Sequence, residues 1–201
     1  MMQLLAASPY VKNGSGVFNT MSNNTDKDLF KLLGKFEQQQ KMPPVESWNP
    51  EVEGEIDINI DSQGRWFHEG GHFDRQDLAR MFASILRREG DDYYLVTPAE
   101  KLKIRVEDVP FSIVLMKCDA VSSQQQLSFM TSLGDEVIVN ESNKIEFRTS
   151  SNGDQIPYIE VRNGLWGKLN QSTYYELMNL VQESPEGFFV SSCGCDFRVP
   201  A

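Results

Sequence analysis

The sequence predicts an α+β fold built from two small domains that are related by internal duplication. Strands of alternating polarity flank tight turns, and amphipathic helices follow strands that contain a tryptophan. The two halves carry these features in the same order, with Gly64 and Trp66 placed 100 residues before Gly164 and Trp166. Because agreement over such a distance is typical of repeated units, we interpret the halves as a strand-turn-strand-helix-strand repeat.

The domain boundaries follow from changes in composition along the chain. Residues 1–24 are expected to be disordered or extended, because they are loose and polar. Residues 25–40 place leucines and a phenylalanine on one face of a predicted helix, which opens an N-terminal domain over residues 25–120. The C-terminal domain is expected over residues 121–201, with a seam in the polar stretch 119–126.

The first half predicts a hairpin followed by a helix. Residues 55–61 alternate isoleucines with polar and acidic side chains, as a strand with one wet face does, and residues 65–69 return as its partner. Asp74 is the expected N-cap of a helix that ends near Arg87 and Arg88, where cations suit the helix dipole. Further strands of this half are expected at residues 93–98, 103–108 and 111–118.

The second half predicts the same order after an additional hairpin. Residues 135–140 and 144–149 are expected to pair around a short turn. The next hairpin spans residues 157–170 with its turn at Asn163 and Gly164, and Asn170 is the expected cap of the following helix. The last strands are expected at residues 187–192 and 195–199.

Charge and cysteine content narrow the classes of partner. The net charge of −10 disfavours nucleic acid as a partner and disfavours an electrostatic membrane anchor. No apolar run approaches the roughly 18 residues of a membrane span. Three cysteines are too few for a disulfide framework, so we expect free thiols and a cytoplasmic protein.

Two motifs resemble metal sites without meeting their requirements. His68 and His72 fit the H-E-x-x-H pattern of zinc proteases, but the two glycines between them oppose the helix that this motif needs. Asp57, Asn59 and Asp61 follow the alternation of a calcium loop, but its sixth position is a serine instead of glycine. We therefore expect a solvated strand face and neither a metal nor another cofactor.

Cys193 and Cys195 form a C-x-C pair near the end of the chain. The spacing differs from the usual C-x-x-C of zinc and redox sites, and no second pair accompanies it. We interpret the pair as buried or half-buried thiols near a strand end.

From residue 42 to about residue 118, the chain carries a dense pattern that resembles a bacterial family of domains of unknown function, number 1285. The pattern comprises Pro44, Trp48, Pro50, Gly54, Asp57, Gly64, Trp66, Gly70, Arg75, Leu78 and Phe82, followed by LVTP, EK, VED and PF. The resemblance implies a two-domain α+β fold with a duplicated core and a second half loosely like a pleckstrin-homology barrel. It also implies a binding site at the domain interface, a protein or nucleic-acid partner and a signalling-type role.

The function expected from these observations is that of a non-enzymatic binding or regulatory protein. It would bind a protein or a small ligand at the interface between the two domains, and nucleic acid is less favoured. The alternative is a small cytoplasmic hydrolase or metal-dependent enzyme that uses His68 or His72. The candidate binding residues combine polar and aromatic character near strand ends: Arg65, Trp66, His68, Arg75, Glu100 and Lys101.

Overall fold

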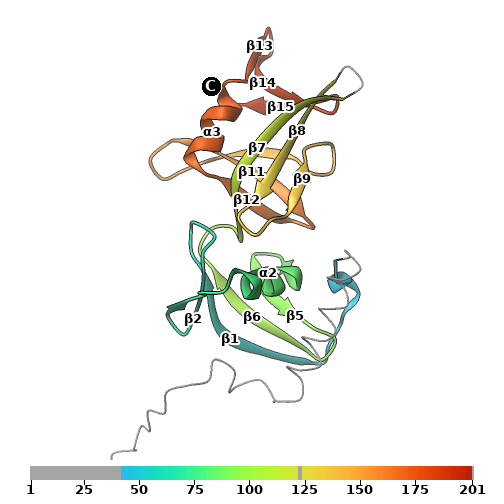
Figure 1. Ribbon diagram of the computed structural model, residues 1–201, viewed down its shortest axis with the longest axis vertical. Coiled ribbons are helices and arrows are strands. Elements are labelled where there is room, and N and C mark those ends of the chain that lie inside the picture. Colours follow the sequence, from blue (N-terminus) through green and yellow to red (C-terminus); the bar gives the residue numbers. More distant parts are fainter. Residues whose placement is uncertain (1–41, 122–123, 201) are drawn as a thin grey trace, which may run out of the picture. The chain divides into compact units, whose positions relative to one another are not determined.

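The structure is a computed structural model that describes residues 42–121 and 124–200 (Figure 1). The segments expected at residues 1–24 and 25–40 lie outside the described residues. The described chain contains two α-helices, of nine and eight residues, among fifteen strands. The fold is therefore mostly β, and the expected balance of α and β was wrong, because both helices are short and continue directly into strands.

The first half is one six-stranded sheet covered on one face by a helix. The strand order is β3-β2-β1-β6-β5-β4, and the pairing of β1 with β6 is parallel. The helix side chain of Phe82 stacks on Trp66 of the sheet, with ring centroids 6.5 Å apart. The elements of this half are η1 (Val45–Ser47), β1 (Val52–Ile60), β2 (Trp66–His68), β3 (Gly71–His72), α2 (Gln76–Ser84), β4 (Leu86–Glu89), β5 (Asp92–Val96) and β6 (Glu100–Val106).

The second half combines a six-stranded sheet with a three-stranded one. The larger sheet has the order β10-β11-β12-β7-β8-β9, and the smaller has the order β13-β14-β15. Figure 1 shows the larger sheet curling strongly, with α3 beside β7. The elements are β7 (Phe111–Val121), β8 (Gln124–Thr131), β9 (Glu136–Ile138), β10 (Ile145–Thr149), β11 (Gln155–Arg162), β12 (Leu165–Leu169), α3 (Gln171–Met178), β13 (Gln182–Ser184), β14 (Gly187–Ser192) and β15 (Cys195–Val199).

The strand registers repeat between the halves. Ile60 pairs with Trp66 in the first hairpin, and Glu160 pairs with Trp166 in the second, so each partner is shifted by 100 residues. After each helix come three paired strands, β4-β5-β6 in the first half and β13-β14-β15 in the second, and equivalent residue pairs there are 95 residues apart. Arg87 pairs with Tyr94, for example, and Gln182 pairs with Phe189. The hairpin and the three strands after the helix recur in the same order and confirm the predicted repeat. The parallel pairing of β1 with β6 is not repeated among the described residues, because β15 pairs only with β14.

The first helix begins and ends differently from the prediction. Its N-cap is Arg75 and not Asp74, and no side chain caps it. The helix ends at Ser84, because Ile85 already accepts the N–H of Val96 and starts the pairing of β4 with β5. Arg87 and Arg88 consequently lie in a strand and not at a helix terminus.

Asn170 caps the second helix as predicted. Its side-chain oxygen accepts the N–H of Thr173 at 2.9 Å. The N-caps Arg75 and Asn170 are 95 residues apart, the same shift as in the strands that follow.

The additional hairpin of the second half was assigned wrongly. Residues 136–138 pair with β8 and residues 145–149 pair with β11, so the two segments do not pair with each other. The chain passes from the first sheet to the second between Val106 and Phe111, whereas the expected seam at 119–126 falls in the pairing of β7 with β8.

Direct contacts join the two halves. Arg162 donates to the carbonyl of Ala83 at 2.7 Å and to Asp135 at 3.1 Å, and its guanidinium lies 4.9 Å from the ring of Phe111. Burial lowers the pKa of Arg162, although Asp135 opposes that shift. Gln76 adds a hydrogen bond to the carbonyl of Ser132 at 2.6 Å.

Neither helix in the described part of the chain has the length and apolar character needed to cross a bilayer.

Candidate functional site

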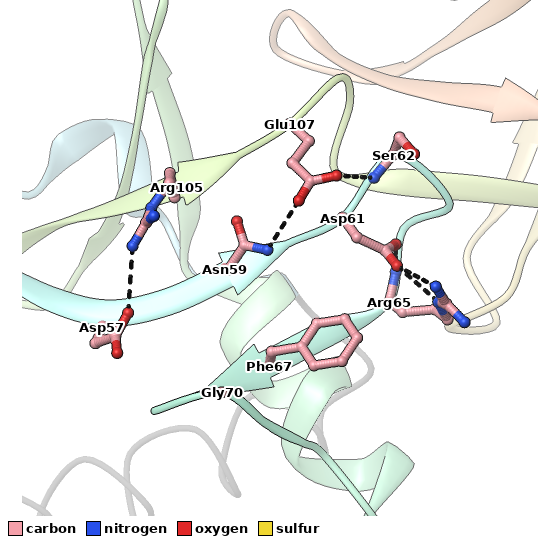
Figure 2. Close-up of a pocket in the computed structure, with 9 residues that line it drawn as sticks. All are labelled: Asp57, Asn59, Asp61, Ser62, Arg65, Phe67, Gly70, Arg105 and Glu107. Atoms are coloured by element: carbon pink, nitrogen blue, oxygen red, sulfur yellow. Dashed lines mark hydrogen bonds and ion pairs between the residues drawn. The ribbon is translucent and has the colours of Figure 1, made fainter.

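A polar groove of about 570 Å³ lies on the first sheet (Figure 2). The side chains of β1 alternate, so one face of this strand carries isoleucines to the core and the other carries polar groups to the groove. The groove is lined by Asp57, Asn59, Asp61, Ser62, Arg65, Phe67, Gly70, Arg105 and Glu107. We refer to these nine residues as the groove.

The groove forms where the parallel pairing of β1 with β6 is interrupted. Glu55 pairs with Lys103, but the next pair joins Asn59 to Arg105, so β1 has extra residues at this point. Such a bulge bends a strand and redirects its side chains. The carbonyl of Asp57 accepts the N–H of Glu69 at 3.0 Å, which holds the bulge against the turn after β2.

Asp61 organises one end of the groove. One carboxylate oxygen accepts the N–H groups of Gln63 and Arg65 at 2.9 Å, and the other accepts the Arg65 guanidinium at 2.6 and 2.7 Å. Burial by itself would raise the pKa of Asp61, but the hydrogen bonds from Arg65 and Gln63 outweigh it and lower the pKa. Asp61 is therefore a fixed carboxylate at neutral pH.

Glu107 lies beside Asp61 and is held by neutral donors. Its carboxylate accepts the N–H of Ser62 at 3.0 Å and the Asn59 side-chain amide at 3.3 Å. The amide oxygen of Asn59 is buried and has no hydrogen-bond donor. An unsatisfied buried acceptor costs roughly 1–3 kcal/mol. Glu107 and Asn59 therefore place a carboxylate acceptor close to a buried amide oxygen that has no donor.

The rim of the groove is more exposed. Arg105 reaches Asp57 at 3.4 Å, and the two side chains are 76% and 60% exposed, so this ion pair is weak. Phe67 adds an apolar ring, whose centroid lies 5.9 Å from the Arg65 guanidinium carbon. Figure 2 shows the ring beside the Asp61–Arg65 pair.

The structure distributes the six predicted site residues over both faces and both ends of the first sheet. Arg65 lines the groove, whereas Trp66 is only 2% exposed and belongs to the core. His68 shares the face of Trp66 because side chains alternate along β2, and Arg75 caps α2.

Glu100 and Lys101 lie at the other end of the sheet, where they pair with Val52 and Glu53 at the start of β1. The ammonium of Lys101 contacts Glu53 at 2.7 Å and Glu89 at 3.2 Å, and these bonds raise the pKa of Lys101. The six residues therefore do not form one site.

The H-E-x-x-H segment is a hairpin and not a helix, as its glycines predict. His68 ends β2, His72 lies in β3, and the turn between them has left-handed backbone at Glu69 and Gly70. Over residues 42–121 and 124–200, no group of three or more His, Cys, Asp or Glu side chains is placed to hold a metal ion.

The C-x-C pair flanks a turn between two strands. Cys193 and Cys195 are half-buried free thiols where β14 passes into β15, as expected for a pair near a strand end.

A smaller hollow of about 320 Å³ lies where the two halves meet, beside Arg80, Ala83, Asp135 and Arg162. The polar groups of Arg162 and Asp135 are bonded to each other there, and Arg162 also holds Ala83. None of the six expected binding residues lines this hollow: Arg65, Trp66, His68, Arg75, Glu100 and Lys101.

Sequence reasoning missed most of the groove. It noted Asp57, Asn59 and Asp61 as a solvated face, but it did not connect them with Arg105 and Glu107. A signal was present, because acidic residues alternate along residues 51–57 and basic residues alternate along residues 101–105. Only the parallel pairing of β1 with β6 brings these two rows together.

Comparisons with known proteins identify relatives for most of the chain. Residues 43–109 match the family described as Domain of unknown function (DUF1285), N-terminal domain, and residues 110–199 match Protein of unknown function (DUF1285), C-terminal domain. No curated protein gives a match.

Two solved structures are similar to this chain. The crystal structure of a DUF1285 family protein from Silicibacter pomeroyi DSS-3 is 38% identical, with a TM-score of 0.75, and covers 79% of this chain and 87% of its own. A DUF1285 family protein from Shewanella baltica OS155 is 30% identical, with a TM-score of 0.49, and covers 61% of this chain and 90% of its own. Since the two family models together span most of the residues, the chain belongs to the DUF1285 family.

Proposed function

We propose that this protein is a non-enzymatic binding protein and that the groove on its first sheet is the binding site. The observation that carries the proposal is the order of the groove's polar side chains. Asp61 fixes Arg65 within one turn, and Glu107 fixes Asn59 across two segments that are far apart in the sequence. A pre-organised set of donors and acceptors lowers the entropic cost of binding a polar ligand.

The repeat supports this choice of site. Asp57, Asn59 and Asp61 correspond, 100 residues on, to Pro157, Ile159 and Val161, which are buried in the second half. Arg65 and Phe67 likewise correspond to the buried Leu165 and Gly167. The same positions are thus part of the second core but line an open groove in the first half.

The composition of the groove favours recognition over catalysis. Its titratable groups are three carboxylates and two guanidiniums, and neither histidine lines it. Nucleophilic catalysis needs a base positioned beside the nucleophile. Ser62, the hydroxyl-bearing member of the groove, contacts Glu107 through its backbone N–H.

The proposal extends to a regulatory role in the cytoplasm. The free thiols of the described cysteines support a reducing compartment. The curled sheet and single α-helix of the second half support a pleckstrin-homology-like barrel, an architecture suited to contacts with partners.

The test is an NMR titration of the ¹⁵N-labelled full chain with defined probes: agmatine, a capped arginine peptide, glutarate and adenosine monophosphate. We expect at least one probe to cause saturating shifts at the amides of residues 57–67 and 105–107. The Asp61→Ala variant should remove these shifts. If every probe leaves those amides unshifted, or shifts them without saturation, the groove is not a binding site.

A further inference from the structure

We infer that the groove takes a guanidinium or ammonium group, carried either by a free amine or by an arginine or lysine side chain of a protein. This inference rests on the proposed function and specifies the chemistry of its ligand. It follows from the charges of the groove, from its two acceptors and from its aromatic ring.

The charges of the groove do not balance. Asp61 and Arg65 form a tight pair, and Asp57 and Arg105 form a loose one. Glu107 is held only by the Ser62 N–H and the Asn59 amide, both neutral donors. Its carboxylate is therefore the one negative charge among the nine groove residues without a cation in contact.

The acceptors of the groove are arranged for a group with several N–H donors. The Asn59 amide donates to Glu107, and its own oxygen lacks a donor. The last torsion of an asparagine side chain is broad, so on binding the amide can give up its bond to Glu107 and turn its oxygen toward a ligand. A guanidinium or ammonium group could then donate to Glu107 and to Asn59 together, through charge-assisted hydrogen bonds.

Phe67 provides a further contact suited to a cation. The Arg65 guanidinium carbon already lies 5.9 Å from the ring centroid and the His72 ring lies 5.4 Å away, so a ligand cation would meet only the part of the ring that borders the groove.

An anionic ligand fits the same contacts less well. Two nitrogens of the Arg65 guanidinium already donate to Asp61. An anion that approached Arg105 would also lie beside the carboxylates of Asp57 and Glu107, which line the same groove. Like charges at such distances repel, so the anion would gain little from the arginines.

The experiment compares agmatine and the capped peptide acetyl-Gly-Arg-Gly-amide with glutarate, each titrated into the ¹⁵N-labelled full chain. The cationic probes should saturate the shifts of the Ser62 and Arg65 amides, with a Kd on the order of 1 mM. Glu107→Gln should weaken their binding at least fivefold. Glu141→Gln, which removes an exposed carboxylate outside the groove, should leave the Kd unchanged.

The outcomes separate the two proposals. Saturation by glutarate and not by agmatine would overturn the cationic assignment and leave the proposed binding function in place, whereas failure of all probes would overturn both. Peptide binding tighter than that of agmatine would point to a protein side chain as the source, and the reverse order to a free amine. Should Glu107→Gln fail to fold, Asp57→Asn provides the second variant, and unchanged agmatine affinity in it would contradict the inference.

Discussion

At the scale of the residue, Asp61 shows how a single carboxylate can hold a turn and one end of the groove together. It accepts two backbone N–H groups and a guanidinium, so the turn that follows β1 depends on its charge. The side chain of Asp57, four residues earlier on the same face of β1, makes one weak contact at 3.4 Å. The two roles differ because the turn after β1 brings the N–H groups of Gln63 and Arg65 to the carboxylate of Asp61 and not to that of Asp57.

We predict that Asp61→Asn lowers the free energy of unfolding by about 1–3 kcal/mol at pH 7. The pKa of Asp61 is lower in the folded chain than in the unfolded chain, so its contribution is present above the unfolded pKa of about 3.9 and is lost as pH falls through the folded pKa. Urea unfolding from pH 7 to pH 3 should show the difference between variant and wild type shrinking. Asp57→Asn is the control, with an expected change within about 0.5 kcal/mol.

A second prediction at this scale concerns the paired turn glycines. Gly64 and Gly164 both have a left-handed backbone, with φ of 75° and 74°. A Cβ on Gly64 would lie 2.9 Å from the backbone nitrogen of Ser112, whereas nothing lies within 4 Å of a Cβ on Gly164. Gly64→Ala should therefore lower the thermal midpoint more than Gly164→Ala, as measured by circular dichroism. Equal losses would mean that backbone strain alone accounts for both.

The role of an individual residue could be predicted from the sequence where that role depends only on its neighbours along the chain. Asn170 caps its helix because an asparagine side chain can accept the N–H three residues on. Asp74 was expected to cap the first helix for the same reason, but the N-cap position is Arg75 and the helix begins at Gln76. Trp66 was a site candidate and is a core residue, since the alternation along β2 turns it toward α2.

At the scale of the element, Arg87 holds the segment before the first sheet. It is buried in β4 and donates to the carbonyls of Val45 and Trp48, while it also contacts Glu89. The bonds fasten η1 along the edge of the sheet. An edge strand otherwise presents unpaired backbone groups, and this covering is one way of protecting it.

We predict that Arg87→Met releases η1, because methionine keeps the apolar stem and loses the donors. The amides of Ser47 and Trp48 should exchange with deuterium at least tenfold faster, as followed by mass spectrometry. The free energy of unfolding should fall by about 1–3 kcal/mol. Arg198→Met, at an exposed position of β15, should change neither quantity, and unchanged exchange in Arg87→Met would show that η1 is held by other contacts.

Most strands could be predicted from period-two alternation, but their partners could not. The pairing of β1 with β6 joins residues that are nearly 50 positions apart, and a helix and four strands lie between them. Local patterns favour neighbouring segments as hairpins, and this preference led to the wrong pairing of residues 135–140 with 144–149. The groove went unnoticed for the same reason, because its two walls come from β1 and from the end of β6.

At the scale of the whole molecule, Arg162 joins the two halves. Its guanidinium binds Asp135 in its own half and the carbonyl of Ala83 in the other. Removing it would leave the part-buried carboxylate of Asp135 without its cation, with the Thr131 hydroxyl as a neutral donor, and would remove the bond between the halves at Ala83. The predicted repeat itself was visible in the sequence, but the residues that connect its copies were not, since a repeat pattern describes each copy separately.

We predict that Arg162→Met weakens the cooperation between the halves. Scanning calorimetry should show the unfolding transition broaden or split, because the van't Hoff enthalpy falls below the calorimetric enthalpy. The matched control is Arg148→Met. Arg148 contacts Glu146, Tyr158 and Trp166 inside the second half, so its loss should lower stability and keep a single transition. A single sharp transition in Arg162→Met would contradict this role.

The two register shifts, 100 residues in the hairpins and 95 in the strands after the helices, have a practical consequence. The two shifts differ by five residues, so the first half contains five residues that the second half lacks. They lie between β2 and α2, in the stretch that includes β3. The second half passes from β12 to its helix without them, so this stretch is dispensable to the repeat, although Gly70 within it borders the groove. Residues 69–74 are therefore a natural graft position, at which loops of varied length could be exchanged to redesign ligand selectivity while the scaffold beneath is preserved.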